Sequence, residues 1–135
     1  MFDSNEVVRA YLASQATLTA VVGTRIQCPR LNPNTTLPAI SFFGNGGPKP
    51  NPHIPDIVKS RKQFDCWASS LKQARQVYGL LYDVLQGVNN QTVLVGVTPY
   101  YLRSAEEEFP GQDLVDEDIP NYYRVLTFFY IEIRA

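Results

Sequence analysis

The segment from Lys59 to Gly87 most constrains the fold, because it reads as a strand that runs directly into a long helix. Up to Ala68 polar and apolar residues alternate, which is the period of a half-buried strand. Ser70 then offers a helix N-cap with Gln73 three residues later, a capping box, and Gly87 stands where a C-terminal cap belongs. The segment therefore predicts a helix that packs against a sheet.

The same segment predicts most of the core. Apolar residues recur at steps of three and four along the helix, so one stripe of it faces inward. The strand alternation points its apolar side chains to the same side. The core residues expected on these grounds are Phe64, Cys66, Leu71, Tyr78, Leu81 and Leu85.

The rest of the chain supplies shorter elements. Asp3 can cap a first helix, residues 16–22 form a second short one, and brief strands are expected at 24–28 and 39–43. Asn89 and Asn90 are expected to make a turn before a strand at 92–98, which Pro99 breaks or bulges. The elements predict a single α+β domain, residues 1–135, with a mostly antiparallel sheet, two main helices packed on one face, and long loops between strands.

The last predicted strand, residues 121–134, is apolar on both faces. Val125, Phe129 and Ile131 lie on one side of it, and Leu126, Phe128 and Tyr130 on the other. Such a strand is covered on both faces either within its own domain or by another chain. Both explanations fit the sequence.

Composition bounds the class of protein. A length of 135 residues, 44% hydrophobic and 19% charged, suits one globular domain, and a net charge of -1 gives no overall attraction to nucleic acid. The two cysteines, Cys28 and Cys66, are read as reduced thiols. The first residues do not resemble a secretory signal, and no apolar run is long enough to span a bilayer.

The charges are unevenly placed. Seven of the thirteen acidic residues fall between Ser104 and Pro120, a stretch without a basic residue. We expected an acidic loop, solvated or facing a partner, in preference to a metal site, because the spacing is not that of a calcium loop. Lys59, Arg61 and Lys62 form the only basic cluster, and three such charges are more often solvated than bound to nucleic acid.

Residues 44–55 hold three glycines and four prolines, which excludes a helix or a central strand. A loop this long is either disordered or a binding element, and a protruding hairpin arm fits its place between two strands. His53, the single histidine, lies in this loop without a nucleophile beside it in sequence. We predict no catalytic, metal-binding or cofactor-binding residue, and no cofactor.

Several short motifs, in their order and spacing, resemble one phage family. They are Val7-Val-Arg-Ala-Tyr-Leu12, Val21-Val-Gly-Thr-Arg-Ile26, Leu37-Pro-Ala-Ile40 and Gln63-Phe-Asp-Cys-Trp-Ala-Ser69, followed by a helix that contains Ala74. Together they look like the tail-terminator, or tail-completion, proteins of long-tailed bacteriophages. The resemblance covers about Asn5 to Leu85 and the final strand, and it gives Trp67 a core-packing role beside Phe64 and Leu81. The loop at 44–55 and the acidic segment lie outside the pattern.

The resemblance implies a protein without enzymatic activity that caps the tail tube, ends its polymerisation and presents a surface for joining the head. Members act as hexameric rings, so the implied partners are further copies of the chain, the tail tube protein and a head-side connector or stopper. DNA would pass through the ring without sequence-specific binding, and no membrane is involved. The expected location is the head-proximal end of the virion tail, after assembly in the host cytoplasm.

In such a ring, acidic side chains near the channel would repel DNA phosphates, whereas on a ring face they could steer a basic partner. The residues expected to face a partner or the channel are Glu106, Glu107, Glu108, Asp116, Glu117, Asp118, Lys59, Arg61 and Lys62. The alternatives are a neck or head-completion connector and, with less support, a small-ligand-binding α+β domain. The last would need a concave site with convergent polar groups, which the sequence does not indicate.

Overall fold

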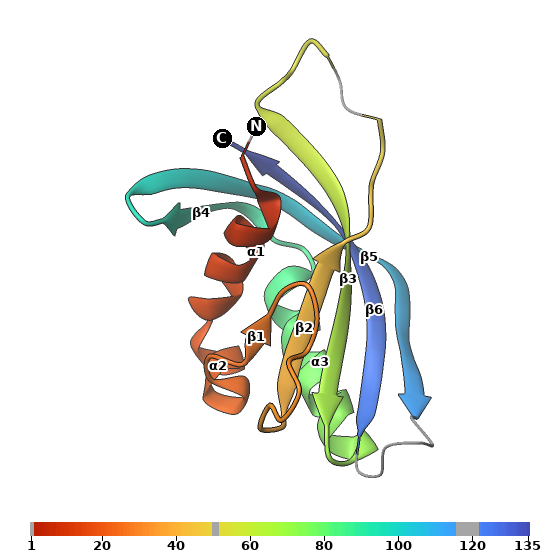
Figure 1. Ribbon diagram of the computed structural model, residues 1–135. Helices are drawn as coiled ribbons and strands as arrows, with labels where there is room; N and C mark the ends of the chain where they lie inside the picture. The colour runs from red at the N-terminus through yellow and green to blue at the C-terminus, as the bar shows by residue number, and fades with distance from the viewer. Residues whose placement is uncertain (1, 50–51, 116–121) are drawn as a thin grey trace.

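The structure, a computed structural model, describes residues 2–49, 52–115 and 122–135 (Figure 1). Within these ranges the chain forms three helices and six strands. In chain order they are α1 (Ser4–Ala13), α2 (Ala16–Val22), β1 (Ile26–Gln27), β2 (Ala39–Gly44), β3 (Ile57–Ala68), α3 (Leu71–Leu85), β4 (Asn89–Val95), β5 (Thr98–Val115) and β6 (Tyr123–Arg134).

The strands of the described ranges make one curled sheet in the order β1-β2-β3-β6-β5-β4 (Figure 1). Neighbouring strands are antiparallel except for β1 and β2, which are parallel. The expected fold was wrong in its balance: the sheet is mixed, a third helix contributes, and strands occupy segments expected to be loops. The chain is therefore more sheet-dominated than the sequence pattern indicated.

The largest correction is at the acidic segment. Residues expected to form a loop after Ser104 continue β5, which is 18 residues long and pairs with β6 up to Val115. Asn89 and Asn90 begin β4 and make no turn. The chain turns instead at Gly96, whose φ is +63°, and Pro99 stands next to this turn, at the start of β5, where a missing amide is tolerated.

Side-chain caps fix where α1 and α3 begin. The carboxylate of Asp3 accepts a hydrogen bond of 2.9 Å from the amide of Asn5, and the Ser70 hydroxyl accepts one of 3.2 Å from the amide of Gln73. Helix α3 lies across β3, β6 and β5. Helix α1 lies beside β4 and β1. All three helices of the described ranges share one core with the sheet.

The core lies between the helices and one face of the sheet. Phe64 packs there against Phe42 and Phe129, with ring centroids 5.5 and 5.8 Å apart. Of the residues expected in the core, the fully buried ones are Phe64, Cys66, Leu81 and Leu85. Trp67, Leu71 and Tyr78 are only half-buried, and the first of these lies on the other face of the sheet.

Between β2 and β3 the chain leaves the sheet as an arm that projects beyond its end, where both termini also lie (Figure 1). The base of this arm continues the pairing: the Asn45 amide donates to Arg61 O at 2.7 Å, and the Arg61 amide donates to Gly46 O at 2.8 Å. A Cβ on Gly47 would lie 2.8 Å from Lys59 O, so only glycine fits there. The described part of the arm is residues 45–49 and 52–56.

Candidate interaction surface

One face of the sheet has no helix packed on it within the described ranges; we call it the open face. The alternation of side chains decides which residues it carries, because neighbours along a strand point to opposite faces. Phe64 and Cys66 point to the helices, and so the odd-numbered residues of β3 point away from them. The open face carries Lys59, Arg61, Gln63, Asp65 and Trp67 from β3, paired with Glu132, Tyr130, Phe128, Leu126 and Arg124 from β6.

Cations lie over aromatic rings along this face. The Arg61 guanidinium is 3.9 Å from the ring centroid of Phe128, and the Lys59 ammonium is 5.8 Å from that of Tyr130. Arg61 also forms an ion pair with Glu108. Each cation–ring contact contributes about 0.5–1 kcal/mol at an exposed site. The contacts hold the side chains of the open face in an ordered layer.

Trp67 anchors the other end of the layer. Its indole N–H donates a 2.9 Å hydrogen bond to the hydroxyl of Ser41, and the Arg124 guanidinium lies 5.3 Å from the indole ring. Arg124 also pairs with the buried carboxylate of Asp65 at 3.4 Å. Burial raises the pKa of Asp65, while the Arg124 charge and the hydrogen bonds from Gln63 and Arg124 act in the opposite direction.

Two bulges in β5 place a third row of side chains on the open face. Glu106, Phe109 and Gln112 pair with Tyr130, Phe128 and Leu126, so β5 advances three residues for every two of β6. Each bulge inserts one extra residue and redirects the side chains that follow it. Phe109 consequently lies against Phe128, with ring centroids 6.2 Å apart, yet remains 52% exposed.

The edge of β5 that faces away from β6 changes its hydrogen-bonding partner partway along the strand. β4 pairs with β5 only as far as Ser104. Beyond that point α3 and the residues that follow it supply the hydrogen-bond partners: Gly87 N donates to Ala105 O at 3.3 Å, and the Glu107 amide donates to the side chain of Gln86 at 2.9 Å. An edge covered in this way does not accept an added strand there.

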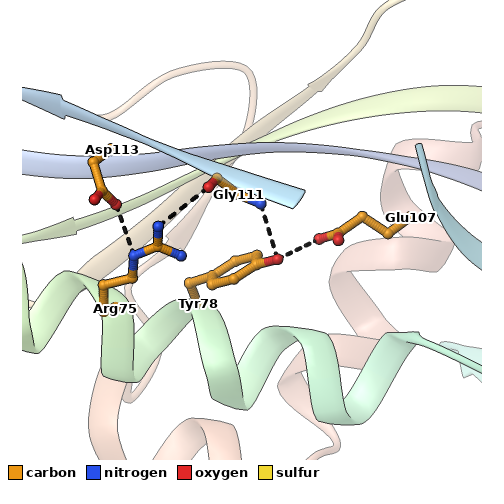
Figure 2. Close-up of polar contacts among 5 residues, drawn as sticks. All are labelled: Arg75, Tyr78, Glu107, Gly111 and Asp113. Carbon is orange, nitrogen blue, oxygen red and sulfur yellow. Dashed lines mark hydrogen bonds and ion pairs between the residues drawn. The ribbon is translucent and has the colours of Figure 1, made fainter. Parts of the chain in front are cut away.

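Figure 2 shows how side chains of α3 also occupy this edge of β5 around Gly111. The Gly111 amide donates to the Tyr78 hydroxyl at 3.0 Å, and Arg75 donates to the Gly111 carbonyl at 3.3 Å. Arg75 also pairs with Asp113, its Nε 2.7 Å from Oδ1 (Figure 2). A Cβ on Gly111 would lie 2.8 Å from the Tyr78 ring and from Val125 Cγ1, so the edge approaches α3 as closely as glycine permits.

Tyr78 and Thr127 share one acceptor. The Tyr78 hydroxyl donates to Glu107 Oε2 at 2.7 Å, and the Thr127 hydroxyl donates to the same oxygen at 2.8 Å. Burial, and next the hydrogen bond to Glu107, raise the pKa of Tyr78 to about 12. This network joins α3, β5 and β6 and is structural in character, because its hydroxyls and carboxylate satisfy one another.

The acidic residues predicted to face a partner or the channel have three different surroundings. Glu106 is exposed on the open face, Glu107 lies on the helix side beneath α3, and Glu108 pairs with Arg61. Asp116, Glu117 and Asp118 lie outside the described residues. Phe109 was not predicted, although Phe109, Leu114 and Val115 within an acidic run were a signal against a wholly solvated loop.

The basic cluster is also divided, and Lys62 was assigned to the wrong side. It is 2% exposed, and its ammonium donates to the Ser4 hydroxyl and the Asn5 side-chain oxygen, both at 2.7 Å. Burial lowers the pKa of Lys62. The alternation that turns Phe64 and Cys66 inward turns Lys62 inward as well, so the sequence did contain this signal. Lys59 is exposed and Arg61 half-buried, both on the open face.

A groove of about 680 Å³ lies where the arm meets the sheet. Its apolar lining residues are Pro48, Pro52, Ile54, Pro55, Ile57 and Val58. Its charged lining residues are Lys49, Lys59, Arg103 and Glu132. The arm thus forms one wall of a largely apolar groove that also has three cations and one carboxylate in its lining; we call it the arm groove.

Within the described ranges, no group of His, Cys, Asp and Glu side chains is placed to hold a metal ion. No helix in the same ranges combines the length and apolar character needed to cross a membrane. Comparison of the chain with protein-family models and with curated proteins finds no match. The open face and the arm groove are therefore interpreted from their own chemistry.

Proposed function

We propose that this chain is a structural assembly subunit: a tail-terminator-like protein that forms a ring at the head-proximal end of a phage tail. In that role it caps the tail tube, ends its polymerisation and presents the surface that joins the head. Its partners are further copies of itself, six in a closed ring, the tail tube protein and a head-side connector. The resemblance in the sequence motivates this proposal.

The observation that carries the proposal is the composition of the open face. It presents Trp67, Phe128, Tyr130 and Phe109 together with Arg61 and Arg124, ordered by cation–ring contacts and ion pairs. Aromatic residues and arginine are the types enriched at protein–protein interfaces. A strand as apolar on its second face as β6 is expected when another chain covers that face.

The covered edge of β5 bears on how subunits would meet. Gln86, Tyr78 and Arg75 occupy hydrogen-bonding groups of the strand beyond Ser104. Neighbours in the ring would therefore meet through side-chain surfaces, which can close by rotation, and not by adding strands at this edge. Acidic residues of the 104–120 segment near the channel would repel the phosphates of passing DNA.

Electron microscopy of tails assembled without this protein tests the proposal. We expect tubes of uncontrolled length that carry no heads. Tails of normal length would contradict the terminator assignment, and normal tails that fail to join heads would indicate a neck connector in its place.

A pair of variants tests the open face in the same assay. Phe128→Asp should fail to restore normal tails, whereas Leu94→Asp, on the exposed β4–β5 hairpin, should restore them. Circular dichroism of both proteins shows whether each is folded. Restoration by a folded Phe128→Asp protein would remove the open face from the proposal.

A further inference from the structure

The row made of Glu106, Phe109 and Gln112, which we call the β5 strip, is an apolar residue with a polar residue on either side, all on the open face. Phe109 is half exposed although it is the largest side chain of the strip. Glu106 forms no ion pair with any described residue. The nearby carboxylates of Glu108 and Asp113 are paired with Arg61 and Arg75, so Glu106 is the carboxylate of this row that remains to meet a cation.

The arm groove has the opposite character. Most of its lining residues are apolar, and the charged ones are three cations, Lys49, Lys59 and Arg103, and one carboxylate, Glu132. Arg103 is the cation that approaches this carboxylate, at 3.8 Å. Neither Lys49 nor Lys59 pairs with a carboxylate among the described residues. The groove could therefore accept an apolar side chain that has acidic neighbours.

Phe109, the apolar residue of the β5 strip, cannot reach the arm groove of its own chain. Phe109 lies beside Phe128, and the groove begins at Glu132, four residues further along β6. At about 3.3 Å per residue this separation is roughly 13 Å, longer than a phenylalanine side chain. The sheet holds both sites in place, because β6 is paired on both sides over this stretch.

We propose that the β5 strip of one copy binds the arm groove of the next, with Phe109 against its apolar lining residues and Glu106 near Lys59. The contact is heterologous, since the two sites differ, and repetition of it by rotation closes a ring. Charge complementarity favours this occupant, because the groove carries two lysines and the strip one carboxylate, Glu106, that form no ion pair among the described residues. The inference rests on the proposed ring-forming function and names the contact that builds the ring.

Charge reversal in mixed proteins tests the contact. Glu106→Lys alone sets a lysine against Lys59, and Lys59→Glu alone sets two glutamates together, so each should self-associate at least about tenfold more weakly than wild type in sedimentation velocity. An equimolar mixture should recover the wild-type assembly. Around an alternating ring each contact is then either the original pair or the reversed pair.

The matched control is Asp83→Lys, which makes the same change of charge on the exposed face of α3 and should leave assembly unchanged. Loss of assembly in this control equal to that of Glu106→Lys would overturn the proposal, because net charge alone would then explain the loss. A mixture that stays dissociated would overturn it too. So would a wild-type protein that remains monomeric at every concentration, or one that stops at two copies.

Cross-linking adds a positional test. In a Cys28→Ser background, Phe109→Cys mixed with Ile54→Cys should give a disulfide between chains, and Val97→Cys mixed with Ile54→Cys should not. Equal cross-linking of both mixtures would contradict the assignment. These experiments measure self-association alone, and tail length is measured separately. An assembly unaffected by the variants would remove this contact and leave the proposed ring standing, whereas normal tails without the protein would remove the proposed function.

Discussion

The hydroxyl of Tyr78 accepts a hydrogen bond from the amide of Gly111, and through it a helix occupies a backbone group that a neighbouring strand would otherwise use. The same hydroxyl donates to Glu107, which ties the bulge between Glu107 and Phe109 to α3 and β6. The position of Phe109 on the open face depends on this arrangement, because hydrogen bonds from Tyr78 of α3 fix Glu107 and Gly111 on either side of it.

Replacement of Tyr78 by phenylalanine should destabilise the protein by about 1–3 kcal/mol, because the Gly111 amide then lacks its partner and Glu107 loses a donor. Urea unfolding measures the change. The matched control is Tyr82→Phe, at an exposed tyrosine of the same helix, and should cost less than about 0.5 kcal/mol. Equal effects of the two changes would show that the Tyr78 hydroxyl contributes nothing.

The raised pKa of Tyr78 predicts a loss of stability at high pH. Since the pKa is about 12 in the folded protein and 10.0 ordinarily, the folded state favours the protonated phenol. The resulting stabilisation is complete below pH 10 and is lost as the pH rises through 12. Unfolding by urea at successive pH values should therefore show a steeper decline for wild type than for Tyr78→Phe. Burial also raises the pKa of Tyr11, which both proteins share, so parallel curves would contradict the assignment to Tyr78.

Gly111→Ala should be destabilising by about 1–3 kcal/mol, because its Cβ would lie 2.8 Å from the Tyr78 ring and from Val125. Gly79 provides the control, since its Cβ would meet nothing within 4 Å and it lies inside α3. Gly79→Ala should stabilise by about 0.5–1 kcal/mol. Thermal unfolding of the two proteins should thus shift in opposite directions, and a shift in the same direction would be inconsistent with the close approach at Gly111.

Lys62→Met should alter the pH dependence of stability in the alkaline range. Burial lowers the pKa of Lys62 from its ordinary 10.5, so the unfolded state binds the proton more tightly and the charged lysine costs stability at neutral pH. Wild type should gain stability relative to Lys62→Met as the pH rises toward 10.5. A constant gap between wild type and Lys62→Met would mean that the pKa of Lys62 is the same in both states.

Local patterns predicted the elements that carry their own signals. The N-cap at Ser70, the apolar spacing through Leu85 and the alternation along β3 are properties of neighbouring residues, and each predicted element is present. The predicted division of the β6 side chains between two faces is present as well. The part of β5 beyond Ser104 was missed because its stability depends on distant partners: β6 on one side and α3 with the residues after it on the other.

The candidate surface was predictable only in part. Lys59 and Arg61 were selected for their charge and lie on the open face, whereas Lys62 follows the strand period into the interior. Phe109 indicated only that its segment is not wholly solvated, and Gly111 gave no local signal for its role. Their positions depend on bulges, which change the spacing between strands and are visible only once the partner strand is known.

The three-for-two spacing of β5 against β6 makes the segment from Glu106 to Gln112 sensitive to its length more than to its exact composition. Removal of a single residue between them would erase one bulge and turn the following side chains to the opposite face. Gly111 would then leave its place beneath α3 even if every remaining residue type were kept. In this stretch the number of residues is itself a determinant of which surface the subunit presents.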